Sequence, residues 1–214
     1  MSGRPSCANS APLVALQDAT KHYRGRCVLR LRELELRQGD SMLIVGANGS
    51  GKSTLLRVLA GVTTLSSGCA HHYDAFDALE IGYVPQMGGL HPNLTVAENL
   101  RLAIQLRGRR SPDRLTQRWY VDGLDLAPLM NTCYRDLSGG FKRLAALSCA
   151  LATEPRGLFV DEPLSGIDTA HARQVVDGLS ATMSHLDVLV VTSHTPSDFP
   201  FVSRVVELKS GEME

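Results

Sequence analysis

The segment at residues 46–54 reads GANGSGKST, after a short apolar run and before a stretch rich in helix formers. It fits the phosphate-binding pattern G-x-x-x-x-G-K-[ST]. Its glycines let the backbone curl around an anion, and the N–H groups at the helix N-terminus attract it. Lys52 can reach the outer phosphates of a nucleotide, and Ser53 can ligate Mg²⁺. A glycine-rich turn without a ligand is the weaker alternative. The predicted phosphate-binding residues are Asn48, Gly49, Ser50, Gly51, Lys52, Ser53 and Thr54.

Two adjacent carboxylates, Asp161 and Glu162, directly follow the apolar run at residues 157–160. Ligands of open α/β sheets bind at the carboxyl ends of the strands. A carboxylate at Asp161 can hold Mg²⁺, directly or through water, and Glu162 can polarise an attacking water. A strand that ends in a solvated acidic turn is the alternative, which the phosphate loop makes much weaker.

A second glycine-rich segment at residues 137–143 reads LSGGFKR. Ser138, Gly139 and Gly140 come before a predicted helix, so they form another helix N-terminus that favours an anion. Taken alone, this segment indicates only a helix cap with flexible glycines.

The elements that must position these residues follow from the hydrophobic pattern. Residues 27–36 alternate apolar and charged side chains, as a half-exposed antiparallel strand does. Thr95 and Glu98 have the spacing of a capping box at a helix start. The other predicted strands are 13–19, 42–45, 81–84, 157–160, 188–191 and 204–208, and the predicted helical regions are 54–60, 94–117, 118–129, 138 onward and 170–184.

Buried strands that alternate with helices predict an α/β fold with a mostly parallel central sheet. We expect a flexible tail at residues 1–12, followed by a single domain over 13–214. Within it we expect an N-terminal antiparallel β subdomain and an α-helical subdomain inserted at about 87–145.

The composition restricts the function. The chain has 214 residues, with 22 basic and 22 acidic side chains, so no global positive field indicates nucleic-acid binding. Its five cysteines form no C-x-x-C pair, which favours a reduced, cytosolic protein. Since no apolar run approaches the roughly 18 residues that span a bilayer, a role at a membrane would need a membrane partner.

The ordered set of motifs resembles the ATP-binding-cassette (ABC) ATPases over residues 13–210. The set comprises the phosphate loop, Gln86 after Tyr83-Val84-Pro85, the LSGG signature at 137–140, Asp161-Glu162, the segment 165–168 (SGID), and His194 after a strand. The fold that this resemblance implies is the P-loop NTPase fold, and the ligands are ATP and Mg²⁺.

The resemblance also implies roles for single residues. Tyr23 stands where ABC proteins place an aromatic ring that stacks on adenine, although an ordinary strand-edge tyrosine is the alternative. Gln86 resembles the glutamine that contacts Mg²⁺ and the attacking water, and His194 the histidine that contacts the γ-phosphate. Asp168 resembles the acidic residue of the loop that crosses the dimer interface. The implied catalytic residues are Glu162, His194 and Gln86, and the implied metal ligands are Ser53, Gln86 and Asp161.

In this family two cassettes pack head to tail, so that ATP on one phosphate loop is covered by the signature of the other. The resemblance therefore implies a second ABC subunit as partner, contacted through Ser138, Gly139 and Gly140. The usual glutamine after LSGG is Phe141 here. We expect the site to survive this departure, because the serine hydroxyl and the glycine backbone need no side chain at 141. A lower efficiency, or a heterodimer with one weaker site, is left open.

The implied role is the ATPase subunit of an ABC transporter that powers a separate integral membrane permease. Such a subunit is cytoplasmic and peripheral on the inner face of the cell membrane. Residues 82–108 together with LSGGFKR look like the single-cassette subunits of ABC-2-type exporters, and the chain looks shorter than many importer ATPases, so export is expected. An importer ATPase, a soluble ABC ATPase acting on the ribosome or DNA, and an unrelated phosphate-loop kinase or GTPase are the alternatives. Met87 and Leu90 are candidate contacts with the permease.

Overall fold

The computed structural model describes residues 11–73, 76, 80–108 and 119–213. Most of the predicted tail lies outside these residues, as does the end of the predicted helical stretch after residue 108. Strand β1 (Pro12–Tyr23) already begins at the last residue assigned to that tail. Among the helices within these ranges, none has the length and apolar character that a bilayer crossing requires.

The described strands form a single twisted sheet in the order β4-β1-β2-β9-β8-β3-β7-β6-β5. Strand β1 pairs antiparallel with both β2 and β4, whereas β8, β3, β7, β6 and β5 are all parallel neighbours. The sheet therefore combines a parallel half, which carries the predicted site, with an antiparallel N-terminal half. The remaining strands are β2 (Arg26–Arg37), β3 (Asp40–Val45), β4 (Ser67–His72), β5 (Ile81–Val84), β6 (Gly157–Val160), β7 (Val188–Ser193), β8 (Arg204–Lys209) and β9 (Glu212–Met213).

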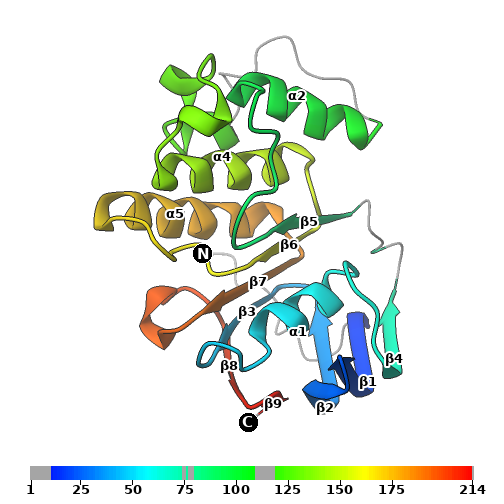
Figure 1. Ribbon diagram of the computed structural model, residues 1–214. Helices are drawn as coiled ribbons and strands as arrows, with labels where there is room; N and C mark the ends of the chain where they lie inside the picture. Colours follow the sequence, from blue (N-terminus) through cyan, green and yellow to red (C-terminus); the bar gives the residue numbers. More distant parts are fainter. Residues whose placement is uncertain (1–10, 74–75, 77–79, 109–118, 214) are drawn as a thin grey trace, which may run out of the picture.

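Helices cover both faces of the parallel half, with α1 on one face and α5, α4 and α2 stacked beyond the other (Figure 1). The described helices are α1 (Lys52–Leu59), α2 (Val96–Leu106), α3 (Trp119–Asp122), α4 (Gly139–Ala152) and α5 (Thr169–Thr182), with short 3₁₀ turns η2 (Ala127–Leu129), η3 (Tyr134–Asp136), η4 (Met183–His185) and η5 (Pro196–Asp198). Helices α2 and α3 and the start of α4 occupy the range 87–145, which we retain as a proposed helical subdomain.

Strand β3 lies between two hydrophobic cores. Met42 and Ile44 are buried in the core beneath α1, whereas Leu43 and Val45 are buried in the core shared with α2, α4 and α5. This alternation follows from the two-residue period of a strand whose both faces are covered. This burial on both faces explains why the strand is a continuous apolar run. It also holds in place the end of β3, from which the phosphate loop begins.

The capping box at the start of α2 is confirmed. The Glu98 N–H donates to Thr95 Oγ1 (3.2 Å), and the Thr95 N–H donates to Glu98 Oε2 (2.8 Å). The predicted helix at 118–129 is wrong as a continuous element, because only α3 and η2 form within it. Asp125 has a φ of 52°, in the left-handed region, so the chain turns there instead of continuing as a helix.

Candidate nucleotide site

The phosphate loop connects the end of β3 to the start of α1, which begins at Lys52 instead of the predicted Thr54. Gly51 has a φ of 103°, and a Cβ atom on it would lie 2.5 Å from the carbonyl oxygen of Val28. Gly49 has a φ of 77° but open space around it. The loop therefore needs glycine at 51 for two independent reasons, backbone conformation and close contact.

Lys52 is the first residue of α1, and its side chain points back into the loop. Its Nζ donates to the carbonyl oxygens of Gly46 (2.8 Å) and Ala47 (3.2 Å) and lies 3.1 Å from Glu162 Oε1. The residue is only 4% exposed. A buried ammonium group is stable only when it is paired and hydrogen-bonded, and these three oxygens provide that pairing.

Asp161 lies at the end of β6 and is fully buried. Its Oδ1 accepts hydrogen bonds from Ser53 Oγ (3.0 Å) and Thr192 Oγ1 (2.8 Å). Its Oδ2 is also buried but has no hydrogen-bond partner among the described residues. Buried polar atoms are rarely left unpaired. Oxygen ligands suit Mg²⁺, so an unpaired carboxylate oxygen beside a serine hydroxyl fits the metal that the sequence predicts.

Glu162 is the point at which the other polar side chains meet. Its Oε2 accepts a hydrogen bond from Gln86 Nε2 (2.8 Å), and its Oε1 contacts both Lys52 and His194 Nε2 (3.1 Å). Its φ is 43°, a backbone conformation that costs a non-glycine residue energy and recurs at functional sites. Its N–H donates to Thr192 Oγ1 (2.8 Å), which holds it at the strand end.

His194 follows β7 and is exposed. Its Nδ1 lies 3.1 Å from the carbonyl oxygen of Gly46 and its Nε2 lies 3.1 Å from Glu162 Oε1. Both ring nitrogens thus face oxygen acceptors, and a proton on either one has a partner. The imidazole therefore connects the phosphate loop to the carboxylate of Glu162.

The second glycine-rich motif starts α4, on the other side of the sheet from α1. Ser138 is the N-cap, and its Oγ accepts a hydrogen bond from the Phe141 N–H (3.4 Å). Ser138 and Gly139 are exposed, and Gly140 is buried. Within the described part of the chain, no hydrogen bond joins this motif to the cluster around Glu162, so the predicted site residues fall into two separate groups.

Two further predicted residues lie away from the cluster around Glu162. Asp168 caps α5, where its Oδ1 accepts from the N–H groups of Ala170 (3.0 Å) and His171 (3.1 Å). Hydrogen bonds from the His171 backbone and ring keep the pKa of Asp168 below its ordinary value. Tyr23, at the end of β1, is exposed, with Lys21 Nζ 5.2 Å from its ring centroid. The ring is thus accessible for stacking.

Three residues that the sequence did not indicate also support the site. Thr192 holds both Asp161 and the backbone of Glu162. Arg143 Nη1 donates to the carbonyl oxygen of Pro85 (2.9 Å), next to Gln86, and burial lowers the pKa of this guanidinium. His171 packs against Gly140. The position of Thr192 two residues before His194, at the end of an apolar run, was the one available signal.

Comparisons with known proteins find relatives in both sequence and structure. A family model described as ABC transporter matches residues 29–165. The chain is 30% identical to the alpha-glucoside transport ATP-binding protein AglK of Rhizobium meliloti over 93% of this chain and 58% of that protein. It is 31% identical to the maltose/maltodextrin import ATP-binding protein MalK of Escherichia coli K12 over 94% of this chain and 56% of that one. The chain therefore spans less than two thirds of the length of these relatives.

Among solved structures, the dimeric post-hydrolysis state of the ATP-binding cassette MJ0796 bound to ADP and Pi is similar, with a TM-score of 0.83 and 26% identity. The similarity covers 94% of this chain and 96% of that one. It confirms the predicted fold class, a P-loop α/β ATPase with a mostly parallel sheet and a helical region. On the family match and this structural likeness, the chain belongs to the ABC transporter family.

Proposed function

We propose that the chain binds ATP with Mg²⁺, hydrolyses it, and powers a separate membrane permease from the inner face of the cell membrane. One observation carries this proposal. Lys52, Gln86 and His194, from three distant parts of the chain, all contact the carboxylate of Glu162. ABC cassettes are ATPases that use ATP and Mg²⁺, and this cluster has the groups that such a reaction needs.

Each residue has a distinct task in this proposal. Lys52 and the α1 N-terminus bind the phosphates, since both offer positive charge in a partly enclosed loop. Glu162 accepts the proton of the attacking water, and Gln86 and His194 orient its two oxygens. Ser53 and Asp161 are placed to hold Mg²⁺, which would neutralise charge on the phosphates. Tyr23 offers a ring for the adenine base.

The exposed signature motif supports a head-to-tail dimer. Ser138 and Gly139 begin α4 but make no hydrogen bond to the Glu162 cluster of their own chain, as far as the described residues go. An accessible helix N-terminus of this kind suits an anion brought by another surface. The similar cassette of known structure is a dimer, which supports a dimer here, and we place Asp168 at its interface.

The direction of transport is better supported as import. The two curated relatives are named for alpha-glucoside transport and for maltose/maltodextrin import. The expectation of an ABC-2-type exporter, which rested on residues 82–108 together with LSGGFKR, has no support from these relatives. We therefore propose that the chain serves the uptake of a solute that the permease selects.

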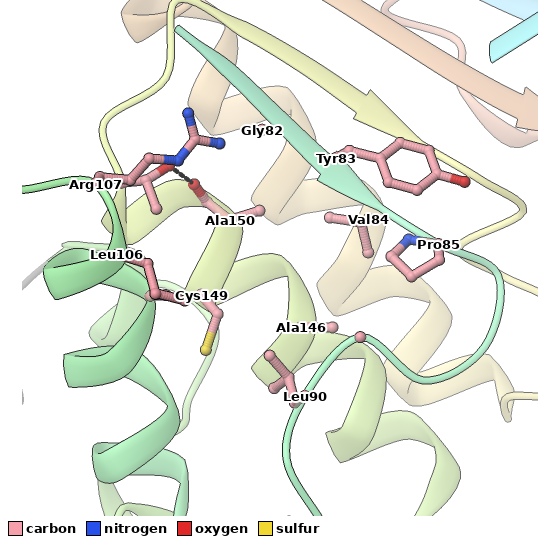
Figure 2. Close-up of a pocket in the computed structure, with 13 residues that line it drawn as sticks. Gly82, Tyr83, Val84, Pro85, Leu90, Leu106, Arg107, Ala146, Cys149 and Ala150 are labelled. Carbon is pink, nitrogen blue, oxygen red and sulfur yellow. Dashed lines mark hydrogen bonds between the residues drawn. The ribbon is translucent and has the colours of Figure 1, made fainter. Parts of the chain in front are cut away.

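The permease contact is proposed beside Gln86. Met87 is 85% exposed, an unusual exposure for a large apolar side chain. Leu90 borders a cavity of about 200 Å³ between the end of β5, α2 and α4 (Figure 2). This surface adjoins Gln86, whose side chain contacts Glu162. A partner that shifts Met87 and Leu90 would therefore also move Gln86.

A single substitution tests the ATPase proposal. Glu162→Gln keeps the size of the side chain but removes the proton acceptor, so turnover should fall by at least about 100-fold while ATP binding is retained. The variant should then accumulate as an ATP-stabilised dimer in size-exclusion chromatography. Glu33→Gln, on the exposed surface of β2, is the control. Full ATPase activity in Glu162→Gln would remove Glu162 from the proposed role.

The partner is tested in the source cells. Tagged Glu162→Gln protein, held with ATP and Mg²⁺ and solubilised in mild detergent, should retain a multi-span membrane protein, identified by mass spectrometry. Uptake or release by vesicles that contain this complex would then give the direction. Recovery of ribosomal proteins or DNA-repair factors instead would overturn the transporter proposal.

A further inference from the structure

The N-termini of α4 and α5 are joined by an aromatic contact that the proposed ATPase function does not require. The rings of Phe141 and His171 meet edge to face, with centroids 4.6 Å apart and an angle of 84° between the planes. This is a favourable geometry for two aromatic rings. Phe141 is the residue that stands in place of the usual glutamine after LSGG.

The same histidine lies directly against the signature backbone. A Cβ atom on Gly140 would come within 2.4 Å of His171 Cγ, so the ring occupies the space that any other residue at 140 would need. His171 thus touches two consecutive residues of the motif. Its position determines how closely the start of α4 approaches α5.

His171 is also held by Asp168. Its Nδ1 lies 2.5 Å from Asp168 Oδ2, and its backbone N–H donates to Asp168 Oδ1 (3.1 Å). The imidazole is therefore fixed in orientation by a carboxylate that also caps α5. A continuous chain of contacts therefore runs from the 165–168 loop to the signature helix, through Asp168, His171 and Phe141.

We propose that Phe141 and His171 are positioning residues, which hold the Ser138–Gly139–Gly140 backbone at a fixed place relative to the 165–168 loop for catalysis. This inference rests on the proposed ATPase function. The contact lies at the partly exposed rim of the α4–α5 packing, where the His171 side chain is 20% exposed. A partly exposed contact contributes less to stability than a fully buried one, although Phe141 also packs against the main core, so we expect the variants to change turnover more than stability.

Lys52 and the phosphate loop lie at the start of α1, whereas the signature motif lies at the start of α4. Nucleotide affinity and turnover should therefore respond differently to changes at the two motifs. Nucleotide affinity of the monomer should depend on the phosphate loop, whereas turnover should depend on both motifs. A residue that merely stabilises the fold would change the melting temperature along with both of these properties.

The test uses Phe141→Leu, His171→Leu and the double variant, with His22→Leu on the exposed surface of β1 as control. Each single variant should lower kcat about tenfold, with unchanged monomer affinity for a fluorescent ATP analogue and a melting temperature lowered by only a few degrees, because one aromatic contact is lost. The double variant should lose no more than either single one, because residues that act as one unit are not additive. His171→Asn keeps a nitrogen donor near the Nδ1 position and should restore part of the activity.

The opposite results would overturn the inference. Unchanged kcat in both single variants, losses that multiply to about 100-fold in the double variant, or a melting temperature that falls in step with kcat would each do so. These results are distinguishable from failure of the proposed function, which would appear as absent turnover in the unmodified protein. If His171→Leu does not fold, the ATP-driven dimer of Glu162→Gln combined with His171→Asn gives the decision. This combination should dimerise at a lower ATP concentration than Glu162→Gln with Phe141→Leu, and an equal requirement for ATP would contradict the inference.

Discussion

The two glycine-rich motifs both begin a helix, yet their surroundings differ. At the start of α1, Lys52 is buried and contacts two loop carbonyls and the carboxylate of Glu162. At the start of α4, Ser138 and Gly139 are exposed, and the local hydrogen bond is a cap within the same turn. One motif is enclosed by its own chain, whereas the other is open.

The difference teaches that glycine content alone does not define a site. The loop before α1 lies at the carboxyl end of β3, where the ends of β6 and β7 bring Asp161, Glu162 and His194 toward it. The motif before α4 lies beside the segment that follows β5, because Gly139 and Gln86 line the same pocket, but within the described residues no hydrogen bond joins it to the Glu162 cluster. We propose that a second subunit brings the anion to this helix N-terminus, which is the physical reason to expect a dimer.

The largest effect is expected from glycine substitutions in the enclosed loop. Gly51→Ala should cost about 3 kcal/mol or more in the free energy of unfolding, because a strained backbone and a clash with Val28 add together. Gly49→Ala carries only the backbone strain, about 1–2 kcal/mol, because the space around it is open. Urea denaturation of both variants gives the two values. Equal losses would show that the contact with Val28 is unimportant.

The next largest effect compares the two lysines at the helix starts. Lys52→Ala should raise the Kd for ATP about 100-fold, or about 2.8 kcal/mol, because it removes a buried positive charge from the phosphate site. Lys142→Ala, in the first turn of α4, should leave the monomer Kd unchanged. Titration with a fluorescent nucleotide measures both. An unchanged Kd in Lys52→Ala would disprove the phosphate-loop assignment.

A smaller effect is expected from adjacent glycines of the open motif. Gly140→Ala should destabilise the fold by about 1–3 kcal/mol, since its Cβ would overlap the His171 ring. Gly139→Ala meets only the carbonyl oxygen of Gly166, at 3.7 Å, and should unfold like the unmodified protein. Thermal denaturation of the two variants measures this difference in stability between positions 139 and 140. Similar melting temperatures would contradict the close approach of His171.

The smallest effect concerns the stability of the fold at acidic pH. The pKa of Asp168 in the folded protein is lowered, first by the His171 backbone N–H and then by its ring. Because this pKa is lowered on folding, the ionised carboxylate stabilises the fold at pH values above its ordinary pKa of 3.8. That stabilisation is lost as the pH falls through the folded pKa. Melting temperatures below pH 4 should therefore drop slightly less in Asp168→Asn than in the unmodified protein. An identical pH dependence would contradict this role of the cap.

Much of the fold and part of the site follow from contiguous sequence. The loop at 46–54, the Asp161-Glu162 pair and the Thr95–Glu98 capping box are local patterns with a direct physical meaning, and the strands at 81–84 and 157–160 have the bounds that the hydrophobic runs predict. The parallel order of β3, β7 and β6 follows from alternation with helices. Local rules are sufficient where the relevant residues are neighbours in the chain.

The rest depends on contacts between distant residues. Thr192 holds Asp161 from 31 residues away, and Arg143 reaches the carbonyl oxygen of Pro85 from 58 residues away. No periodicity or composition indicates such pairs. The helix predicted at 118–129 fails for a local reason instead, because Gly123 and Pro128 disfavour a helix interior and Asp125 between them adopts a left-handed turn.

The alternating burial of β3 has a consequence for how the protein melts. Because neighbouring residues of this strand belong to different hydrophobic cores, neither core can dissolve while the other keeps the strand intact. Unfolding of the two halves is therefore coupled into one cooperative transition. A nucleotide bound at the end of β3 would stabilise α2 and α4 as much as α1, by mass action on the whole transition. Heat resistance of the helical region thus reports on occupancy of the phosphate loop.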